Sequence, residues 1–335
     1  MKIIHQEGKL LTDDYIKRFA DISYLPKADK NVIFLINYYR NLKSYQFHLV
    51  IVEDDGTDIA RVMVGTNTYW PFAFFGMFEC IDNFDVFEMM MDRAEQLIVS
   101  QTHSTLLGPI NFNGIHGWMF RFMGNCNDLP NEDLHPSYYT HFFEKSGWSI
   151  KERSVSGHVH DHEQRRLTTG VNRINNTMIK NGHKPILLSS LSLDDWVEIL
   201  YPFILRNFDI HFHKYIPLDF TFFKTLCINF FSQFDDKYCL LGSLHDDRLS
   251  SFILSYPVGN ANKYTVKTVA VDKRYRWGVP YAWCFKTIAC HTEDKYGHVL
   301  TWRRTNTKNE GTKRLRKNSK ITHQHVCFSK NIDRR

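Results

Sequence analysis

The chain has 335 residues, 43% hydrophobic and 15% aromatic, which is enough apolar material for two ordinary domains or one large one. No apolar run reaches the roughly 18 to 20 residues of a membrane helix, and the start MKIIHQEGKL lacks the apolar segment of a secretion signal. Seven cysteines without a CxxC pair argue against a disulfide framework and predict reduced thiols in a cytoplasmic protein.

The net charge of +6 is divided unevenly along the chain. Residues 1–160 hold 14 of the 42 basic and 20 of the 36 acidic residues, a net charge of −6, so the remainder has a net charge of +12. A basic half of this size predicts an anionic partner, such as a nucleotide-bearing cofactor, an acidic carrier protein or nucleic acid. A solvated basic face without a partner is the plain alternative.

Residues 1–162 are predicted to form one domain of alternating strands and helices. Alternating apolar residues indicate strands, and apolar residues three and four apart indicate helices. The expected elements are a strand and a helix within Ile3–Asp29, a helix at Asn31–Arg40, a hairpin of Tyr45–Val52 and Ile59–Asn67, a strand at Phe72–Ile81, a helix at Phe84–Gln101, a strand at Thr105–Leu107, a helix at Ser137–Lys145 and a strand at Trp148–Val159.

Residues 163–184 are polar with little periodicity, and we expect a linker or an exposed helix there. The order of elements then repeats in residues 185–335, which predicts an internal duplication. The expected elements are a strand at Pro185–Leu191, helices at Ser192–Phe208 and Pro217–Phe234, a hairpin of Tyr238–Leu244 and Leu249–Pro257, a strand at Tyr264–Val271, a helix to about Lys295, a strand at Val299–Arg303, a short helix near Gly311–Lys317 and a strand at His325–Ser329.

The stretch from Val266 to Ala282 carries the clearest functional signal. An apolar strand passes through a basic turn, Lys273–Arg276, and then through Gly278 into an amphipathic helix. This order presents backbone N–H groups and a helix N-terminus to an anionic phosphate. An ordinary strand-to-helix connection with surface arginines is the alternative.

In this order and in these residues, the sequence resembles the GNAT acyltransferase superfamily in its tandem, two-domain form. The family signature is a fourth strand, a turn of the type Gln/Arg-x-x-Gly-x-Gly/Ala and a helix, which together bind the pyrophosphate of coenzyme A. Thr268–Val271 looks like the end of that strand, and Tyr275–Pro280 looks like the turn, with Pro280 where a small residue is usual. Asn309–Thr312 resembles the start of the last family helix, and His325–Lys330 resembles its closing strand.

The first half resembles a second, degenerate copy of the same domain. The similar segments are Leu107–Phe112, Ser137–Tyr139 and Phe143–Trp148. Met77–Asp85 reads MFECIDNFD in this copy and lacks the basic glycine turn, so we expect this half to bind no coenzyme and to shape the acceptor cleft.

The resemblance implies an α+β (α/β) fold of two tandem GNAT-like domains, each with a mixed, twisted sheet flanked by helices. It implies an N-acyltransferase that moves an acyl group from acyl-CoA, with acetyl-CoA expected, to the amine of a small molecule or an amino-acid-like acceptor by direct attack on the thioester. The coenzyme contacts it implies are Val269, Val271, Arg274, Arg276, Trp277, Gly278, Val279, Tyr281, Ala282, Asn309 and Thr312.

The catalytic groups are less sharply indicated by the sequence. The backbone at Val269 would contact the thioester oxyanion, and His211, His213 and Glu79 are candidate acid or base groups. Asn111 and Asn113 would add acceptor contacts from the first copy. The family's tyrosine proton donor has no counterpart, because no tyrosine follows Tyr296.

Two alternatives to this function stay open at this point. The fold could be a catalytically inactive binding module, or the enzyme could take its acyl group from an acyl-carrier protein docked on the basic tail. His158, His160 and His162 alternate as zinc ligands can, but we expect no metal site. The expected partner is a small amine, without a membrane or nucleic acid.

Overall fold

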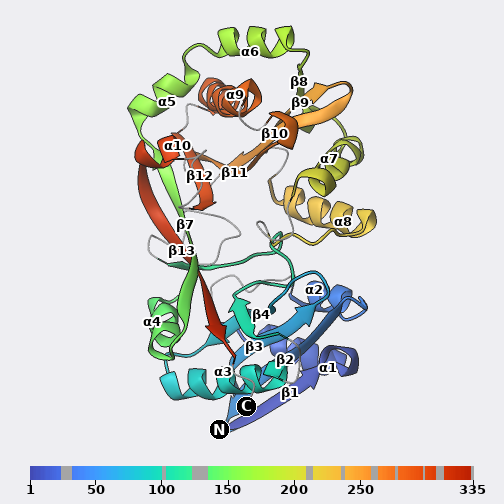
Figure 1. Cartoon of the computed structure of the whole chain (residues 1–335), viewed down its shortest axis with the longest axis vertical. Helices are drawn as coiled ribbons and strands as arrows, with labels where there is room; N and C mark the ends of the chain where they lie inside the picture. The colour runs from blue at the N-terminus through green and yellow to red at the C-terminus, as the bar shows by residue number, and fades with distance from the viewer. Residues whose placement is uncertain are drawn as a thin grey trace.

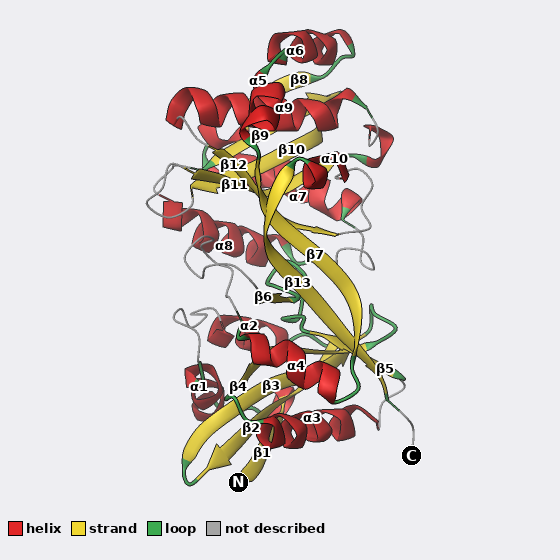
Figure 2. Ribbon diagram, turned by 90° about the vertical axis from the view of Figure 1, so that its left-hand side faces the viewer, coloured by secondary structure: helices red, strands yellow, loops and turns green. Residues whose placement is uncertain are grey.

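The computed structural model describes residues 1–23, 32–99, 103–122, 135–208, 214–234, 238–257, 263–275, 278–296, 299–306 and 313–332. Figure 1 shows an elongated molecule with two lobes stacked along its long axis. The N-terminal lobe comprises the elements from β1 to α4, and the C-terminal lobe comprises those from α5 to α10. Two long strands, β7 and β13, run between the lobes, and Figure 2 shows them side by side.

The N-terminal lobe follows the predicted order of elements closely. Its hairpin turns at Asp55 (φ 46°) and Gly56 (φ 79°), both in the left-handed region that a two-residue hairpin turn requires. Thr12 caps the first helix, because its hydroxyl accepts from the Tyr15 N–H. The elements are β1 Lys2–Glu7, α1 Asp13–Asp21, α2 Val32–Tyr39, β2 Tyr45–Asp54, β3 Thr57–Asn67, β4 Ala73–Cys80, α3 Phe84–Val99, β5 Thr105–Gly108, β6 Phe120–Phe122 and α4 Ser137–Lys145.

The C-terminal lobe repeats this order after two additional helices. Side-chain caps at Ser192 and Asp219 begin its two consecutive helices, α7 and α8. The elements are α5 Asp161–Thr168, α6 Val171–Lys180, β8 Lys184–Leu187, α7 Leu193–Asn207, α8 Phe220–Phe231, β9 Cys239–His245, β10 Arg248–Pro257, β11 Lys263–Val271, α9 Val279–Tyr296, β12 Val299–Asn306 and α10 Lys313–Lys317.

The range 163–184, expected as a linker or an exposed helix, lies mostly in α5 and α6, which pack on α9. The Trp283 indole donates to the Asn175 side chain at 2.6 Å, and the Lys286 ammonium donates to the carbonyl of Thr169 at the end of α5. These helices therefore cover the outer face of the C-terminal lobe. The division at residues 162 and 185 stays a prediction.

The two lobes exchange their inner strands. β7 (Ser149–Val159) pairs with β12 of the C-terminal lobe, although it follows α4 of the N-terminal lobe in the chain. β13 (Ser319–Asn331) lies between β5 and β7, so the last strand enters the sheet of the N-terminal lobe. One continuous sheet results, in the order β1-β2-β3-β4-β5-β13-β7-β12-β11-β10-β9-β8. The expected mixed α+β class is confirmed.

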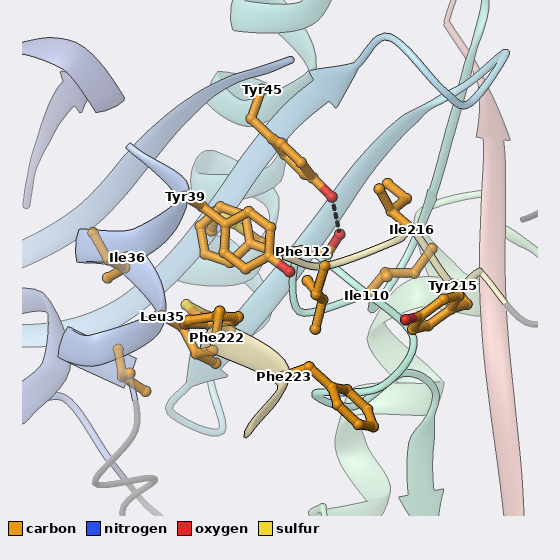
Figure 3. Packing of buried hydrophobic residues seen from close by; sticks show 14 of the residues in the cluster. Leu35, Ile36, Tyr39, Tyr45, Ile110, Phe112, Tyr215, Ile216, Phe222 and Phe223 are labelled. Atoms are coloured by element: carbon orange, nitrogen blue, oxygen red, sulfur yellow. Dashed lines mark hydrogen bonds between the residues drawn. The ribbon is translucent and has the colours of Figure 1, made fainter. Parts of the chain in front are cut away.

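A central hydrophobic core joins the lobes through α1 and α2 on one side and α7 and α8 on the other. Figure 3 shows its middle, where Tyr39 stacks on Phe112 with ring centroids 4.4 Å apart and Phe222 of α8 lies nearby. Aromatic pairs of this kind contribute roughly 0.5–1.5 kcal/mol beyond their buried area. Two further cores lie on the opposite face of the sheet, under α3 and α4 and under α9.

Two further properties concern the helices and the cysteines of the described residues. Among the described helices, none combines the length and hydropathy needed to cross a bilayer. The cysteines in the described part of the chain are free thiols.

Candidate functional site

The last residues of β11 direct two backbone N–H groups away from their neighbour β10. The Asp272 N–H donates to the Ser250 carbonyl on β10 at 2.8 Å. Antiparallel strands alternate between residues that bond to the partner and residues that point away, so Ala270 shares the direction of Asp272, whereas Val269 and Val271 point to the other side.

On that other side, β11 lies beside β12, but the two strands are paired only at their beginnings. Their parallel register in the described chain covers Lys263–Val266 and Val299–Trp302. β12 stays paired with β7 to Asn306, with a shift of register between Trp302 and Thr305. The N–H groups of Val269 and Val271 therefore lie beyond the segment of β11 that is paired with β12. This is the backbone position expected for the oxyanion and coenzyme contacts.

The turn after β11 is held by hydrogen bonds within the protein. Its first residue, Asp272, is 5% exposed and accepts two bonds from the Arg274 guanidinium, at 3.0 and 3.2 Å. Burial raises the pKa of Asp272, but the bonds and charge of Arg274 outweigh it, so the pKa lies below its usual value. The backbone N–H bonds are Lys273 to the Asn207 side chain (3.1 Å), Arg274 to the Asp272 carboxylate (3.0 Å), Tyr275 to the Asp272 carbonyl (2.8 Å) and Gly278 to the Tyr275 carbonyl (3.0 Å).

Helix α9 begins directly after this turn, with an exposed Ala282 and a partly buried Tyr281 in its first residues. Pro280 lies in the first turn, where its missing N–H costs no helical bond. Burial raises the pKa of Tyr281 to about 12, and the positive charge of Arg316 opposes that shift. Arg316 belongs to α10, which packs on the start of β13.

Gly278 allows the close approach between the turn and the helix. A Cβ added at this position would lie 3.3 Å from the Tyr275 carbonyl oxygen and 3.4 Å from the Pro280 ring. A larger side chain would crowd both groups. Gly278, Val279, Tyr281 and Ala282 at the start of α9 follow the end of β11, which carries Val269 and Val271. Their role in binding coenzyme stays a prediction.

The corresponding edge in the N-terminal lobe is closed by the protein's own residues. The parallel pairing of β4 with β5 covers only Ala73–Phe74, so β4 also continues beyond its partner. There the Met77 N–H donates to the Asn111 side chain (2.8 Å), and the Cys80 N–H donates to the Tyr139 hydroxyl (3.0 Å). A Cβ on Gly76 would lie 2.2 Å from the Ile110 carbonyl oxygen. These contacts occupy donors at the end of β4; that the first copy binds no coenzyme stays a prediction.

Glu79 lies in the N-terminal lobe and is not brought to the turn. It is 4% exposed, accepts from the Tyr139 hydroxyl at 3.2 Å and lies 3.7 Å from the Arg61 guanidinium. Its strand β4 is five strand positions from β11, which corresponds to roughly 24 Å across the sheet. The structure therefore gives Glu79 a place in a buried polar network.

The two asparagines expected at the acceptor side join the protein to itself. Asn113 is fully buried and donates to the Ile216 carbonyl at 2.7 Å, which ties the lobes together, while Asn111 holds the edge of β4. Lys214, next to the expected acceptor loop, forms a 3.0 Å ion pair with Glu152 of β7.

Six of the predicted site residues lie outside the described residues: His211, His213, Arg276, Trp277, Asn309 and Thr312. Among the described residues, no group of three or more His, Cys, Asp or Glu side chains is arranged to hold a metal ion. The rings of His160 and His162 stack 5.7 Å apart at the start of α5.

Two residues with clear roles at the turn were missed by the sequence analysis. Asn207 reaches the turn from the end of α7, and Asp272 neutralises Arg274. Asp272 directly precedes the basic run, so its pairing could have been anticipated. Asn207 gave no local signal, because its contact spans 66 residues.

No protein-family model matches the chain, and no curated protein matches it in sequence. Solved structures do match its fold. A tandem GNAT protein from the clavulanic acid biosynthesis pathway aligns over 99% of this chain and 98% of its own, with a TM-score of 0.55 and 9% identity. A probable N-acyltransferase from Enterococcus faecalis V583 aligns over 100% of this chain and 74% of its own, with a TM-score of 0.58 and 10% identity.

A third match is a glucosamine N-acetyltransferase region within a fungal multi-domain GH3 β-N-acetylglucosaminidase. It aligns over 98% of this chain and 38% of its own, with a TM-score of 0.51 and 12% identity. Identities of this size establish the fold alone. The alignments cover nearly the full length of this chain, and they agree with its repeated order of elements and its exchanged strands. The chain therefore has the tandem GNAT fold.

Proposed function

We propose that this protein is an N-acyltransferase that takes an acyl group from a pantetheine thioester and transfers it to an amine. Acetyl-CoA, which carries that arm, is the expected donor. The observation that supports this proposal is the direction of the Val269 and Val271 N–H groups, which point away from β10 just before α9 begins. An extended arm with amide groups fits such a strand edge.

The chemistry requires an uncharged amine to attack the thioester carbonyl. The carbon–nitrogen bond forms and the carbonyl oxygen becomes an oxyanion. The oxyanion then re-forms the carbonyl as the carbon–sulfur bond breaks, and the released thiolate takes up, directly or through water, a proton equivalent to the one that the attacking nitrogen loses. The Val269 N–H would stabilise the oxyanion, and holding the two reactants together would supply much of the remaining acceleration. We assign no general base among the described residues.

The acceptor is proposed to be a small cationic amine. Residues 1–160 carry a net charge of −6, which favours a cation, whereas the basic remainder favours the donor phosphates. Polyamine-like metabolites, amino acids, aminated antibiotics and peptide N-termini all fit this description. We further propose that the reaction takes place in the cytoplasm.

The direct test is calorimetric titration of acetyl-CoA and of free CoA into the protein. The informative variant is Ala282→Glu, which places a carboxylate in the first turn of α9 and would repel the donor phosphates. A carboxylate in the first turn of a helix interacts favourably with the positive end of the helix dipole, so the melting temperature of the Ala282→Glu variant should not fall. The matched control is Asn172→Glu, with the same added charge in the first turn of α6, where the residue is also exposed.

We expect micromolar binding by the parent protein and by Asn172→Glu, and at least a tenfold loss in Ala282→Glu, from like-charge repulsion at short range. Equal binding by all three proteins would place the coenzyme elsewhere. No binding by the parent protein would favour the alternative of an inactive binding module.

A further inference from the structure

We propose that His183 is a positioning residue of the donor site, which holds the turn after β11 in place through Ser250 and Tyr275. This inference rests on the proposed function and adds a residue to its donor site. His183 lies directly before β8, in a group of polar and aromatic side chains that packs against the turn.

The backbone at the end of α6 fixes the place of His183. Gly182 takes a left-handed conformation there (φ 79°), and the His183 N–H donates to the Met178 carbonyl at 3.0 Å, which closes the end of the helix. A Cβ on Gly182 would lie 3.3 Å from Nε2 of His245, so the glycine also leaves room for that ring. The His183 residue is 4% exposed.

Ser250 connects His183 to the first residue of the turn. The pairing of β10 with β9 shifts between Leu249 and Ser251, so Ser250 is an extra, bulged residue of β10. Bulges re-aim a side chain, and the Ser250 hydroxyl oxygen lies 3.0 Å from Nδ1 of His183. The Ser250 carbonyl accepts the Asp272 N–H at 2.8 Å. One bulged residue therefore contacts both His183 and the start of the turn.

The hydrogen bonds of Ser250 indicate which ring nitrogen of His183 carries the proton. The Ser250 hydroxyl donates its one hydrogen to the Ser243 carbonyl at 2.9 Å, so its oxygen accepts from Nδ1 of His183. Burial and the neighbouring His245 lower the pKa of His183, so its ring is neutral at pH 7.5. His183 therefore acts on Ser250 as a neutral donor, a role that a side-chain amide can also fill.

The second contact of His183 is with Tyr275, the last residue of the short 3₁₀ helix in the turn. The two rings meet edge to face with centroids 4.9 Å apart, and the His245 ring lies 5.2 Å from the Tyr275 ring. The Tyr275 N–H donates to the Asp272 carbonyl at 2.8 Å. His183 thus reaches the turn at its first residue through Ser250 and at Tyr275 directly.

The turn lies between the two parts of the proposed donor site. Val271 ends β11 directly before Asp272, and α9 begins at Val279. A shift of the turn would change the spacing between the β11 edge, proposed to pair with the pantetheine arm, and the start of α9, proposed to face the donor phosphates. One ligand spans both parts, so its affinity depends on that spacing. Loss of the His183 contacts should therefore weaken donor binding even where the protein stays folded.

The first experiment measures acetyl-CoA binding by calorimetry at pH 7.5 for the parent protein and for two variants of His183. The amide of His183→Asn can still donate to Ser250, whereas the side chain of His183→Leu donates nothing. We expect a loss of affinity of at least about tenfold in His183→Leu and within about threefold in His183→Asn. Parent-like binding by His183→Leu, or an equal loss in both variants, would overturn the inference and leave the proposed function intact.

The second experiment separates positioning from stability with two neighbouring serines of β10. Ser250 is 1% exposed and Ser251 is 0% exposed, and each hydroxyl lies 2.7 Å from the Ser243 hydroxyl, so removal of either should destabilise the protein similarly. Ser250 bonds to His183, whereas Ser251 stays in register with β9. We expect Ser250→Ala to lose about tenfold in acetyl-CoA affinity and Ser251→Ala to bind like the parent protein, with urea unfolding as the measure of stability.

Equal donor binding by the two serine variants, weakened or not, would overturn the inference, because His183 would then contribute to stability alone. If the parent protein binds no acetyl-CoA, the proposed function is wrong, and the role of His183 falls with it. The parent protein therefore distinguishes the two failures.

Discussion

The stability of this protein should fall between pH 6.5 and pH 5 because of two partly buried histidines, His116 and His135. His116 packs edge-on against the rings of Tyr39 and Phe222, with its Nε2 atom 2.8 Å from the Tyr39 hydroxyl. His135 accepts from the Arg121 N–H at 3.1 Å. Burial lowers the pKa of His116 to about 3. Burial also lowers the pKa of His135, to about 4, although its hydrogen bond with the Arg121 N–H opposes this shift.

The size of the effect follows from proton linkage. In the unfolded chain both histidines take up a proton near pH 6.5, whereas in the folded protein both are still largely neutral at pH 5. Each therefore removes about 1.36 kcal/mol of unfolding free energy per pH unit below 6.5. At pH 5 the two together cost about 4 kcal/mol, a large part of the stability of an ordinary domain.

The assay is urea unfolding at pH 7 and pH 5 of the parent protein, of His116→Gln with His135→Gln, and of His141→Gln. Glutamine takes up no proton, so the double variant should lose less stability on acidification, by about 4 kcal/mol, than the parent protein. His141 is exposed on α4, and its variant should behave like the parent protein. An identical pH dependence in the double variant and the parent protein would refute the reasoning.

The remaining predictions concern the buried polar contacts and the donor site. Asn113→Ala should lower the unfolding free energy by about 1–3 kcal/mol, because it leaves the Ile216 carbonyl unsatisfied between the lobes; urea unfolding measures this, and a change under 0.5 kcal/mol would contradict it. Glu79→Gln should also destabilise the protein, by about 1–3 kcal/mol, yet leave acetyl-CoA binding unchanged; weaker binding with normal stability would return Glu79 to the site. Gly76→Ala should reduce soluble expression or the melting temperature, because its Cβ would lie 2.2 Å from a carbonyl oxygen; a parent-like melting temperature would show that the β4 edge can yield. Arg316→Glu should weaken donor binding several-fold in titration calorimetry and should do so less at high salt; unchanged binding would remove Arg316 from the donor site.

Local patterns predicted nearly every element of the fold. The hairpin at Asp55-Gly56, the helix at Ser137–Lys145 and the strand before the basic turn all lie where the alternation and turn residues indicated. The order of elements and the motifs near Val266–Ala282 also carried a resemblance to the tandem GNAT proteins, and that resemblance implied the correct fold class. These features depend on residues close together in the sequence, which is why the sequence alone could reveal them.

The exchange of strands could not be predicted in the same way. β7 and β13 contact each other from opposite halves of the chain, and His325–Ser329 marks only the middle of a strand that spans Ser319–Asn331. Similarly, the conformation of the turn after β11 depends on the hydrogen bond between Lys273 and Asn207. The buried position of Glu79 depends on its contacts with Arg61 and Tyr139. Each of these contacts is set by tertiary packing, which local periodicity does not encode.

The strand exchange also affects the order in which the protein can fold during synthesis. The N-terminal lobe cannot complete its sheet with its own residues, because the strand beside β5 is Ser319–Asn331, synthesised about 160 residues after β7. At ordinary translation rates this delay is roughly 10–30 s. Throughout that time β5 offers an unpaired edge, which is open to pairing with other chains. Chaperone occupancy of the nascent N-terminal lobe is therefore expected to end only when the last strand has emerged.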